Sequence, residues 1–131
     1  MFEYPKSITS KIKSAKDLSL ILKKLKKKKI AMCHGTFDIV HPGHLRHLIY
    51  AKSKADILIV SCTSDKYVNK GNDRPYVPDD LRAKNLASLS FVDFVIIDHN
   101  EKPLNNLKLL KPHIFVKGFE YSKNGIHQKT K

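Results

Sequence analysis

Two histidines stand three residues apart at the start of a predicted helix, in the segment Gly35-Thr-Phe-Asp-Ile-Val-His-Pro-Gly-His44. Residues at this spacing share one face of a helix, so His41 and His44 are expected to point the same way from its first turn. The first backbone N–H groups of a helix have no partner within it, and with the helix dipole they attract anions. Gly35 and Gly43 allow close approach to the backbone. The segment therefore predicts a phosphate-binding site.

The same two histidines are also compatible with roles that involve no phosphate. A single histidine is most often an ordinary surface or core residue, and a His-x-x-His pair also occurs as half of a metal site. A zinc site needs at least one further protein ligand. The remaining histidines show no spacing that would supply it, and they are His34, His47, His99, His113 and His127. We therefore expect no metal site built from protein side chains.

The phosphate-binding segment joins a predicted strand to a predicted helix. Residues 30–34 form an apolar run that Gly35 ends, and Pro42 suits the first turn of a helix that continues to about residue 53. The alternation then repeats, with strands at 57–62, 91–97 and 114–116 and helices at 79–89 and 104–110. Alternating buried strands and helices predict a Rossmann-like three-layer α/β/α fold with a mostly parallel sheet of about five strands.

Glycines and one long loop mark the expected ligand crevice. In an open α/β sheet this crevice lies at the carboxyl ends of the strands. Gly35 and Gly118 each follow a predicted strand, and Gly71 lies in a long loop at 64–78. Any one of these glycines fits an ordinary turn, but this explanation is weaker for the set as a whole. Since long loops in compact domains are usually functional, residues 64–78 are expected to contribute to the site.

A leading helix precedes the α/β core. Ser14 and Asp17 are spaced as in a capping box, and apolar residues follow at helical spacing: Leu18, Ile21, Leu22 and Leu25. A chain of 131 residues forms one compact domain. We expect this single domain to comprise a leading amphipathic helix and basic run at 1–29 and the α/β core at 30–131.

Composition limits the class of protein. No apolar run reaches membrane-spanning length, and the first residues do not resemble a signal peptide. We therefore expect a cytoplasmic protein with no membrane partner. Cys33 and Cys62 each lie in an apolar run, which favours buried thiols over a disulfide or a metal pair.

The chain is strongly basic, with a formal net charge of +13. Six lysines lie between positions 23 and 29, and the rest of the basic residues are distributed along the chain. Such a charge attracts polyanions, so nucleic acid, an acidic surface or phosphorylated small molecules could each account for it. The lysine run also fits the solvated end of a helix, where lysine complements the helix dipole. Charge alone does not choose among these partners.

The segment at 35–44 closely resembles the signature of the cytidylyltransferase-like nucleotidyltransferases, Gly-Thr-Phe-Asp-x-x-His-x-Gly-His. Within that superfamily, residues 30–121 are most similar to the adenylyltransferase domain of bacterial ADP-heptose synthases, and next to glycerol-phosphate cytidylyltransferases. Class I aminoacyl-tRNA synthetases share the His-x-Gly-His element, but they are far longer and carry a KMSKS element that is missing here. Further matches make the resemblance specific: Ser64-Asp65, Lys70-Gly71, Arg74-Pro75, Arg82, Val92-Asp93 and Val116-Lys117-Gly118.

The resemblance implies that a sugar or polyol phosphate attacks the α-phosphorus of ATP or CTP and displaces pyrophosphate. The nucleophile is already anionic, so catalysis would consist of positioning and charge neutralisation, with Mg²⁺ expected on the phosphates. The implied catalytic residues are His41, His44 and Lys70. The implied nucleotide-binding residues are Gly35, Thr36, Phe37, Asp38, Gly43, Lys117, Gly118 and Glu120, with Asp38 bracing its loop. The implied substrate-binding residues are Asp65, Arg74 and Arg82. Homodimerisation is a further expectation.

Three features depart from the family pattern. A serine-threonine-threonine stretch that contacts the nucleotide should follow Tyr121, but the sequence ends at Lys131 without it. We therefore expect part of the C-terminal region of the domain to be missing. Phe119 and Glu120 stand where the heptose-type proteins usually carry Gly and Asp, which alters the rim of the nucleotide pocket.

Two further functions stay open. One is a nucleotide-binding module without catalysis, which the altered pocket would allow. The other is a basic nucleic-acid-binding protein, which the charge would support. The sequence has no helix-turn-helix pattern, zinc-finger spacing or interleaved surface aromatics, so nucleic acid is the less expected partner.

Overall fold

The computed structural model describes residues 2–68 and 75–116. Within this part, four strands form one sheet in the order β3-β2-β1-β4. The strands are β1 (Ile30–Gly35), β2 (Ile57–Thr63), β3 (Phe94–Asp98) and β4 (Ile114–Val116). Every pairing is parallel, which confirms the predicted sheet type, and the described residues supply four of the roughly five strands expected.

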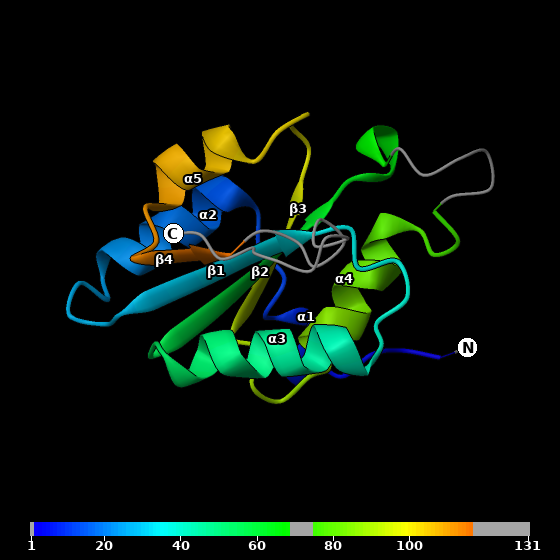
Figure 1. Cartoon of the computed structure of the whole chain (residues 1–131), viewed down its shortest axis with the longest axis horizontal. Helices are drawn as coiled ribbons and strands as arrows, with labels where there is room; N and C mark the ends of the chain where they lie inside the picture. Colours follow the sequence, from blue (N-terminus) through cyan, green and yellow to red (C-terminus); the bar gives the residue numbers. More distant parts are fainter. Residues whose placement is uncertain (1, 69–74, 117–131) are drawn as a thin grey trace.

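Helices cover both faces of the sheet (Figure 1). Helices α2 (Ala15–Lys23) and α5 (Leu104–Leu110) lie on one face, and α3 (Pro42–Ser53) and α4 (Asp79–Ala87) lie on the other. A short helix α1 (Lys6–Thr9) precedes α2, and a 3₁₀ turn η1 (Asp65–Tyr67) follows β2. The predicted three-layer α/β/α architecture is confirmed.

The side chains of β1 show why the central strand is a continuous apolar run. Residues alternate between the two faces of a strand. Ala31 and Cys33 pack in the core between the sheet and α3 and α4, whereas Ile30 and Met32 pack in the core beneath α2 and α5. All six residues of β1 are buried, as expected for a central parallel strand with both faces covered.

Both cysteines are buried free thiols, which confirms the prediction. Cys33 and Cys62 lie on neighbouring strands in the core that faces α3 and α4. Burial disfavours the charged thiolate and raises the pKa of each thiol to about 12. Neither cysteine is therefore a reactive nucleophile at neutral pH.

Several elements differ from what local patterns predict. Helix α4 ends at Ala87 instead of residue 89, and β1 and β2 each extend one residue further, to Gly35 and Thr63. Helix α1 is a single turn without an apolar pattern, so periodicity does not reveal it. Strand β3 begins at Phe94 instead of residue 91, because the chain still turns there after α4, and the Val92 N–H donates to the Leu89 carbonyl at 3.1 Å. The Asp93 carboxylate accepts the backbone N–H of Leu58 and the ammonium of Lys52, each at 2.8 Å. This contact depends on the neighbouring strand, so a local pattern could not reveal it.

The topology places the carboxyl ends of β1, β2 and β3 side by side at one edge of the sheet. Helix α3 begins shortly after β1 at this edge, and its N-terminus points toward it (Figure 1). The predicted site segment lies here. None of the helices in residues 2–68 and 75–116 has the length and apolar character needed to cross a bilayer.

Candidate active site

His41 and His44 form a capping box at the start of α3. His41 is the N-cap residue, and its Nδ1 accepts the backbone N–H of Gly43 at 3.1 Å. His44 lies at the third helical position, and its Nδ1 accepts the backbone N–H of His41 at 3.2 Å. The two ring centroids are 4.0 Å apart. The structure therefore confirms that the two imidazoles share one face of the first turn.

These hydrogen bonds assign the tautomer of both rings. A nitrogen that accepts a backbone N–H carries no proton, so the proton of each neutral imidazole lies on Nε2. Both histidines then act as hydrogen-bond donors through Nε2, and the dipole of α3 is oriented to favour an anion at the same end. His41 is exposed, whereas His44 is buried, with only 8% of its surface exposed. The first turn of α3 thus combines two imidazole donors with the positive end of a helix dipole, an arrangement that can receive an anion.

The turn after β1 has an unusual backbone. Phe37 adopts a left-handed conformation with φ 51°, which is uncommon for a bulky residue and typical of functional loops. Its ring is buried and lies 5.4 Å from the ring of His44, centroid to centroid. Packing between these two rings therefore connects the turn at 35–37 to the first turn of α3.

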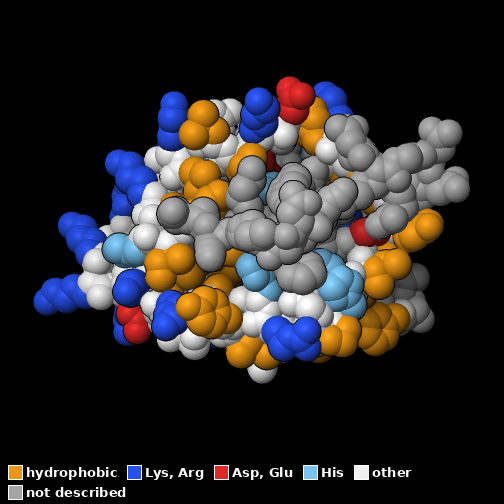
Figure 2. Space-filling view, in the orientation of Figure 1, with side chains coloured by type: hydrophobic (Ala, Val, Ile, Leu, Met, Phe, Trp, Pro, Cys, Tyr) orange, Lys and Arg blue, Asp and Glu red, His pale blue; other side chains and the backbone are white. Residues whose placement is uncertain are grey.

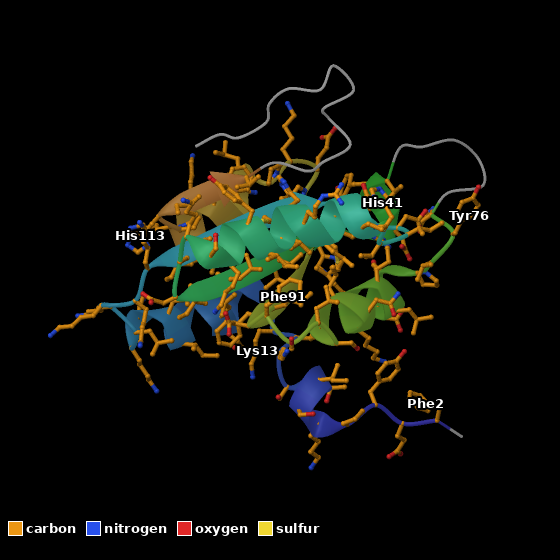
Figure 3. The ribbon with its side chains drawn as sticks, turned by 60° about the horizontal axis from the view of Figure 1, so that its bottom comes forward. Phe2, Lys13, His41, Tyr76, Phe91 and His113 are labelled. Atoms are coloured by element: carbon orange, nitrogen blue, oxygen red, sulfur yellow. The ribbon has the colours of Figure 1, made fainter. Side chains whose placement is uncertain are left out.

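Asp38 fastens this turn to the segment that enters α4. Its carboxylate accepts the backbone N–H of Tyr76 at 2.9 and 3.0 Å and that of Val77 at 2.9 Å. Only 5% of the surface of Asp38 is exposed. Figure 3 shows Tyr76 at the same end of the molecule as His41. These contacts agree with the expected bracing role of Asp38.

Arg82 is the largest fully buried side chain in the described residues. Its Nη1 donates to the carbonyl oxygens of Thr36 at 2.8 Å and Thr63 at 2.6 Å, and its Nε donates to the carbonyl of Val77 at 2.8 Å. Its Nη2 donates to Asp65 Oδ1 at 2.7 Å. One guanidinium thus ties together the carboxyl ends of β1 and β2 and the start of α4.

These contacts give Arg82 a structural role that the sequence did not predict. The side chain was expected to reach the phosphate of the substrate, and that contact stays a prediction. Asp65 is held as well, because its backbone N–H donates to Asp79 Oδ2 at 3.0 Å. Since 45% of the Asp65 side chain is exposed, Asp65 is the more accessible member of the pair.

A second polar cluster is buried at the carboxyl ends of β1, β2 and β3, and it was not predicted from the sequence. His34 Nδ1 lies 2.9 Å from Ser61 Oγ and 3.9 Å from Asp98 Oδ2, and His34 Nε2 lies 3.5 Å from Thr63 Oγ1. Ser61 interrupts an apolar strand, and Asp98 ends one. Polar residues at those two strand positions were the signal that could have revealed the cluster.

Five predicted site residues lie outside the described residues: Lys70, Arg74, Lys117, Gly118 and Glu120. The structure brings together the others, because the turn at 35–38, the first turn of α3, Asp65 and Arg82 all meet at the carboxyl edge of the sheet. Among residues 2–68 and 75–116, no group of three or more His, Cys, Asp or Glu side chains is arranged to hold a metal ion.

Comparison with curated proteins identifies relatives of the chain. It is 47% identical over 113 residues to the bifunctional protein HldE of Campylobacter jejuni subsp. doylei. The matched stretch covers 85% of the chain and 24% of the relative. It is 43% identical over 128 residues to the bifunctional protein HldE of Nitratiruptor sp. This match covers 91% of the chain and 28% of the relative. The chain thus spans about a quarter of the length of these relatives.

Solved structures and family models agree with this relationship. The lipopolysaccharide core biosynthesis protein from Thermoplasma volcanium has a similar structure, with a TM-score of 0.63 and 27% identity over 67% of the chain and 72% of that protein. The model of the cytidylyltransferase-like family matches residues 32–128, which include the turn after β1, the paired histidines of α3 and the buried Arg82. The chain therefore belongs to the cytidylyltransferase-like family of nucleotidyltransferases.

Proposed function

We propose that the protein joins a phosphorylated small molecule, a sugar or polyol phosphate, to the α-phosphate of ATP or CTP and releases pyrophosphate. The observation that carries this proposal is the capping box of α3. It assigns the donor role of each ring to Nε2, and both rings stand at the helix N-terminus beside the edge of the sheet where the turn at 35–37 lies. This arrangement suits a triphosphate, because each component donates to anionic oxygen.

In the proposed reaction, a phosphate oxygen of the acceptor attacks the α-phosphorus. A bond forms between them, the bond from the α-phosphorus to the bridging oxygen breaks, and pyrophosphate leaves with the electron pair. The acceptor is already an anion, so no side chain needs to remove a proton. His41 and His44 would donate to the α- and β-phosphates, where negative charge builds in the transition state.

The backbone of Gly35, Thr36 and Phe37 would surround the triphosphate, with Gly43 allowing close approach at the start of α3. The contacts of Arg82 and Asp38 support this role, because they fix the turn on both sides before any ligand binds. Preorganised donors contribute more to catalysis than donors that must first be ordered.

The proposed contributions of other residues follow the family resemblance. Lys70 would neutralise the phosphates, and Asp65 and Arg74 would position the acceptor, with Arg82 acting on it through Asp65, which it holds. Lys117, Gly118 and Glu120 would border the nucleotide. We also propose that the whole chain forms one domain and that the protein acts in the cytoplasm.

Mg²⁺ is the proposed cofactor, and it would neutralise the charge of the triphosphate and of the departing pyrophosphate. The Asp38 carboxylate accepts two backbone N–H groups. The described residues hold no group of three or more His, Cys, Asp or Glu side chains that could bind a metal ion. The ion would therefore be held mainly by the phosphate oxygens of the nucleotide, as is common for Mg²⁺. Within this proposal, the resemblance to ADP-heptose synthases favours ATP and a sugar phosphate.

Pyrophosphate release tests the proposal directly. The chain is incubated with Mg²⁺, with ATP or CTP, and with a panel of sugar and polyol phosphates. We expect release that needs one nucleotide and one class of acceptor. The matched variant is His44→Gln, because Gln at the third helical position can still cap the His41 N–H but replaces the imidazole Nε2 donor with an amide donor at a different position. It should lose at least about 100-fold in turnover, as when one oxyanion donor is removed.

Two results would contradict the proposal. Tight nucleotide binding with no release for any acceptor would support a non-catalytic module instead. Full activity in both His44→Gln and His44→Ala would show that the imidazole does not act on the phosphates, because alanine carries no donor. Circular dichroism of the variant shows whether a loss of turnover arises from misfolding instead.

A further inference from the structure

A lysine surface covers the end of the molecule remote from the candidate active site. It is defined by exposed lysines from two segments. The first is the end of α2 with the turn after it, and the second is α5 with the residue that follows it. The lysines are Lys23, Lys24, Lys26, Lys27, Lys28, Lys29, Lys108 and Lys111. It forms because α2 packs against α5, which brings two distant segments of the sequence together. Figure 2 shows lysine and arginine side chains gathered along this side of the molecule, at the left.

This lysine surface contains a pocket with an apolar floor. The pocket has a volume of about 260 Å³, and its rim carries Lys23, Lys26, Lys28, Lys111 and His113. Its floor is formed by the apolar side chains Leu22, Leu25, Ile30 and Leu110. A pocket with ammonium groups above apolar walls suits a ligand that carries an anionic group next to an apolar one.

Exposed leucines lie beside the same lysines. Leu109 borders the pocket with 45% of its surface exposed, and Leu20 and Leu104 on the same two helices are 53% and 54% exposed. Lysines around exposed leucines are typical of surfaces that lie on a membrane, where the leucines enter the boundary region and the lysines contact headgroups. The surface has no exposed aromatic or arginine side chain among its described residues, which argues against nucleic acid.

The lysine surface is separate from the candidate active site. β1 begins at Ile30, directly after the lysine run, and ends at Gly35 in the site, so these two ends are about 16 Å apart along the strand. Figure 3 shows His113, at the rim of the pocket, and His41 at opposite ends of the molecule. A partner bound to the lysine surface would leave the candidate active site open to small molecules.

We propose that the lysine surface binds the protein peripherally to an anionic phospholipid bilayer, with the pocket receiving a headgroup phosphate and Leu109 entering the interface. Clusters of four to eight lysines on an amphipathic surface are attracted in this way to acidic lipids. Asp56 is an acidic residue beside the run, and its carboxylate already accepts the Lys29 backbone N–H at 2.8 Å. The expectation of no membrane partner rested on the absence of a spanning segment, and peripheral binding needs none.

Vesicle co-sedimentation of the full chain tests this proposal. The vesicles contain phosphatidylcholine alone or with about one third phosphatidylglycerol. We expect binding to the anionic vesicles only, weakening steeply as salt is raised. Lys26→Glu/Lys28→Glu should weaken binding at least tenfold. The matched control, Lys6→Glu/Arg46→Glu, makes the same change in net charge at exposed positions outside the surface and should change binding less than threefold.

A third variant and two competitors sharpen the test. Leu109→Ser should weaken binding about threefold with lysines intact, because only lipid insertion uses that side chain. Equal losses in the two double variants would overturn the proposal, since they would show a response to net charge. Full competition by inorganic phosphate at constant ionic strength would assign the pocket to a free anion. Binding to a DNA duplex but not to vesicles would assign the surface to nucleic acid. Pyrophosphate release is not used as a readout, so the result does not depend on the proposed reaction.

Discussion

The guanidinium of Arg82 lies 2.7 Å from the carboxylate of Asp65, and the two residues differ sharply in their environments. The Arg82 side chain is fully buried, whereas 45% of the Asp65 side chain is exposed. Solvent therefore screens the charge of Asp65, and the backbone carbonyls of Thr36, Thr63 and Val77 provide most of the compensation for the buried cation. The arginine is better described as a clamp between loops than as half of an ion pair.

Replacing this arginine should lower the stability of the protein. Arg82→Met removes the donors of three buried carbonyl groups, so we expect the free energy of unfolding to fall by about 3 kcal/mol in urea titration. Asp65→Asn keeps an acceptor at an exposed position and should cost less than about 1 kcal/mol. If Asp65→Asn cost as much as Arg82→Met, the ion pair and not the carbonyl bonds would be the dominant contact.

The two roles of His44 can be separated by substitution. His44→Ala removes both the acceptor for the His41 N–H and the donor proposed for phosphate, so it should lower stability by about 1 kcal/mol and also abolish activity. His44→Gln should retain nearly the stability of the unmodified chain, because glutamine is suited to the third position of a capping box. Thermal unfolding and pyrophosphate release of the same samples check this. A stability loss in His44→Gln equal to that in His44→Ala would contradict the capping assignment.

The buried cysteines predict loss of stability at alkaline pH. Burial raises the pKa of Cys33 and Cys62 from 9.0 to about 12, so an unfolded chain releases these protons at lower pH than the folded chain does. Stability from this source is complete below pH 9 and decreases from there to about pH 12, by about 1.4 kcal/mol per pH unit for each thiol. Urea titrations at several pH values measure the slope. The slope should become shallower in Cys33→Ala, in which only one buried thiol remains.

A substitution at the end of α5 should stabilise the protein. Lys111 follows the last helical residue and has a left-handed backbone with φ 50°, a conformation that costs a residue with a β-carbon about 1 kcal/mol. Lys111→Gly should therefore raise the free energy of unfolding by about 0.5–1 kcal/mol. Lys108→Gly, within the same helix, should lower it by about 1 kcal/mol. Thermal melts of both variants distinguish the positional effect from a general effect of losing a lysine.

Local patterns in the sequence determined the order of the elements and the place of the site. The bounds of α5 and of the strand at Ile114–Val116 agree with their predictions, and β1 differs only by including Gly35. These elements follow from apolar periodicity and from glycine and proline at their ends, which are properties of neighbouring residues. The spacing of His41 and His44 on one helix face was determined in the same way.

Tertiary structure alone decided what surrounds those residues. Arg82 has the sequence context of a surface cation on a helix, yet it is buried because folding brings it against carbonyl groups 46 and 19 residues away. His34 and Asp98 come together only because parallel strands align their carboxyl ends. The lysine run gains Lys108 and Lys111 as neighbours because α2 packs on α5. A local pattern carries the periodicity of one element, whereas these contacts depend on which elements meet, and that is determined by the packing of the whole core.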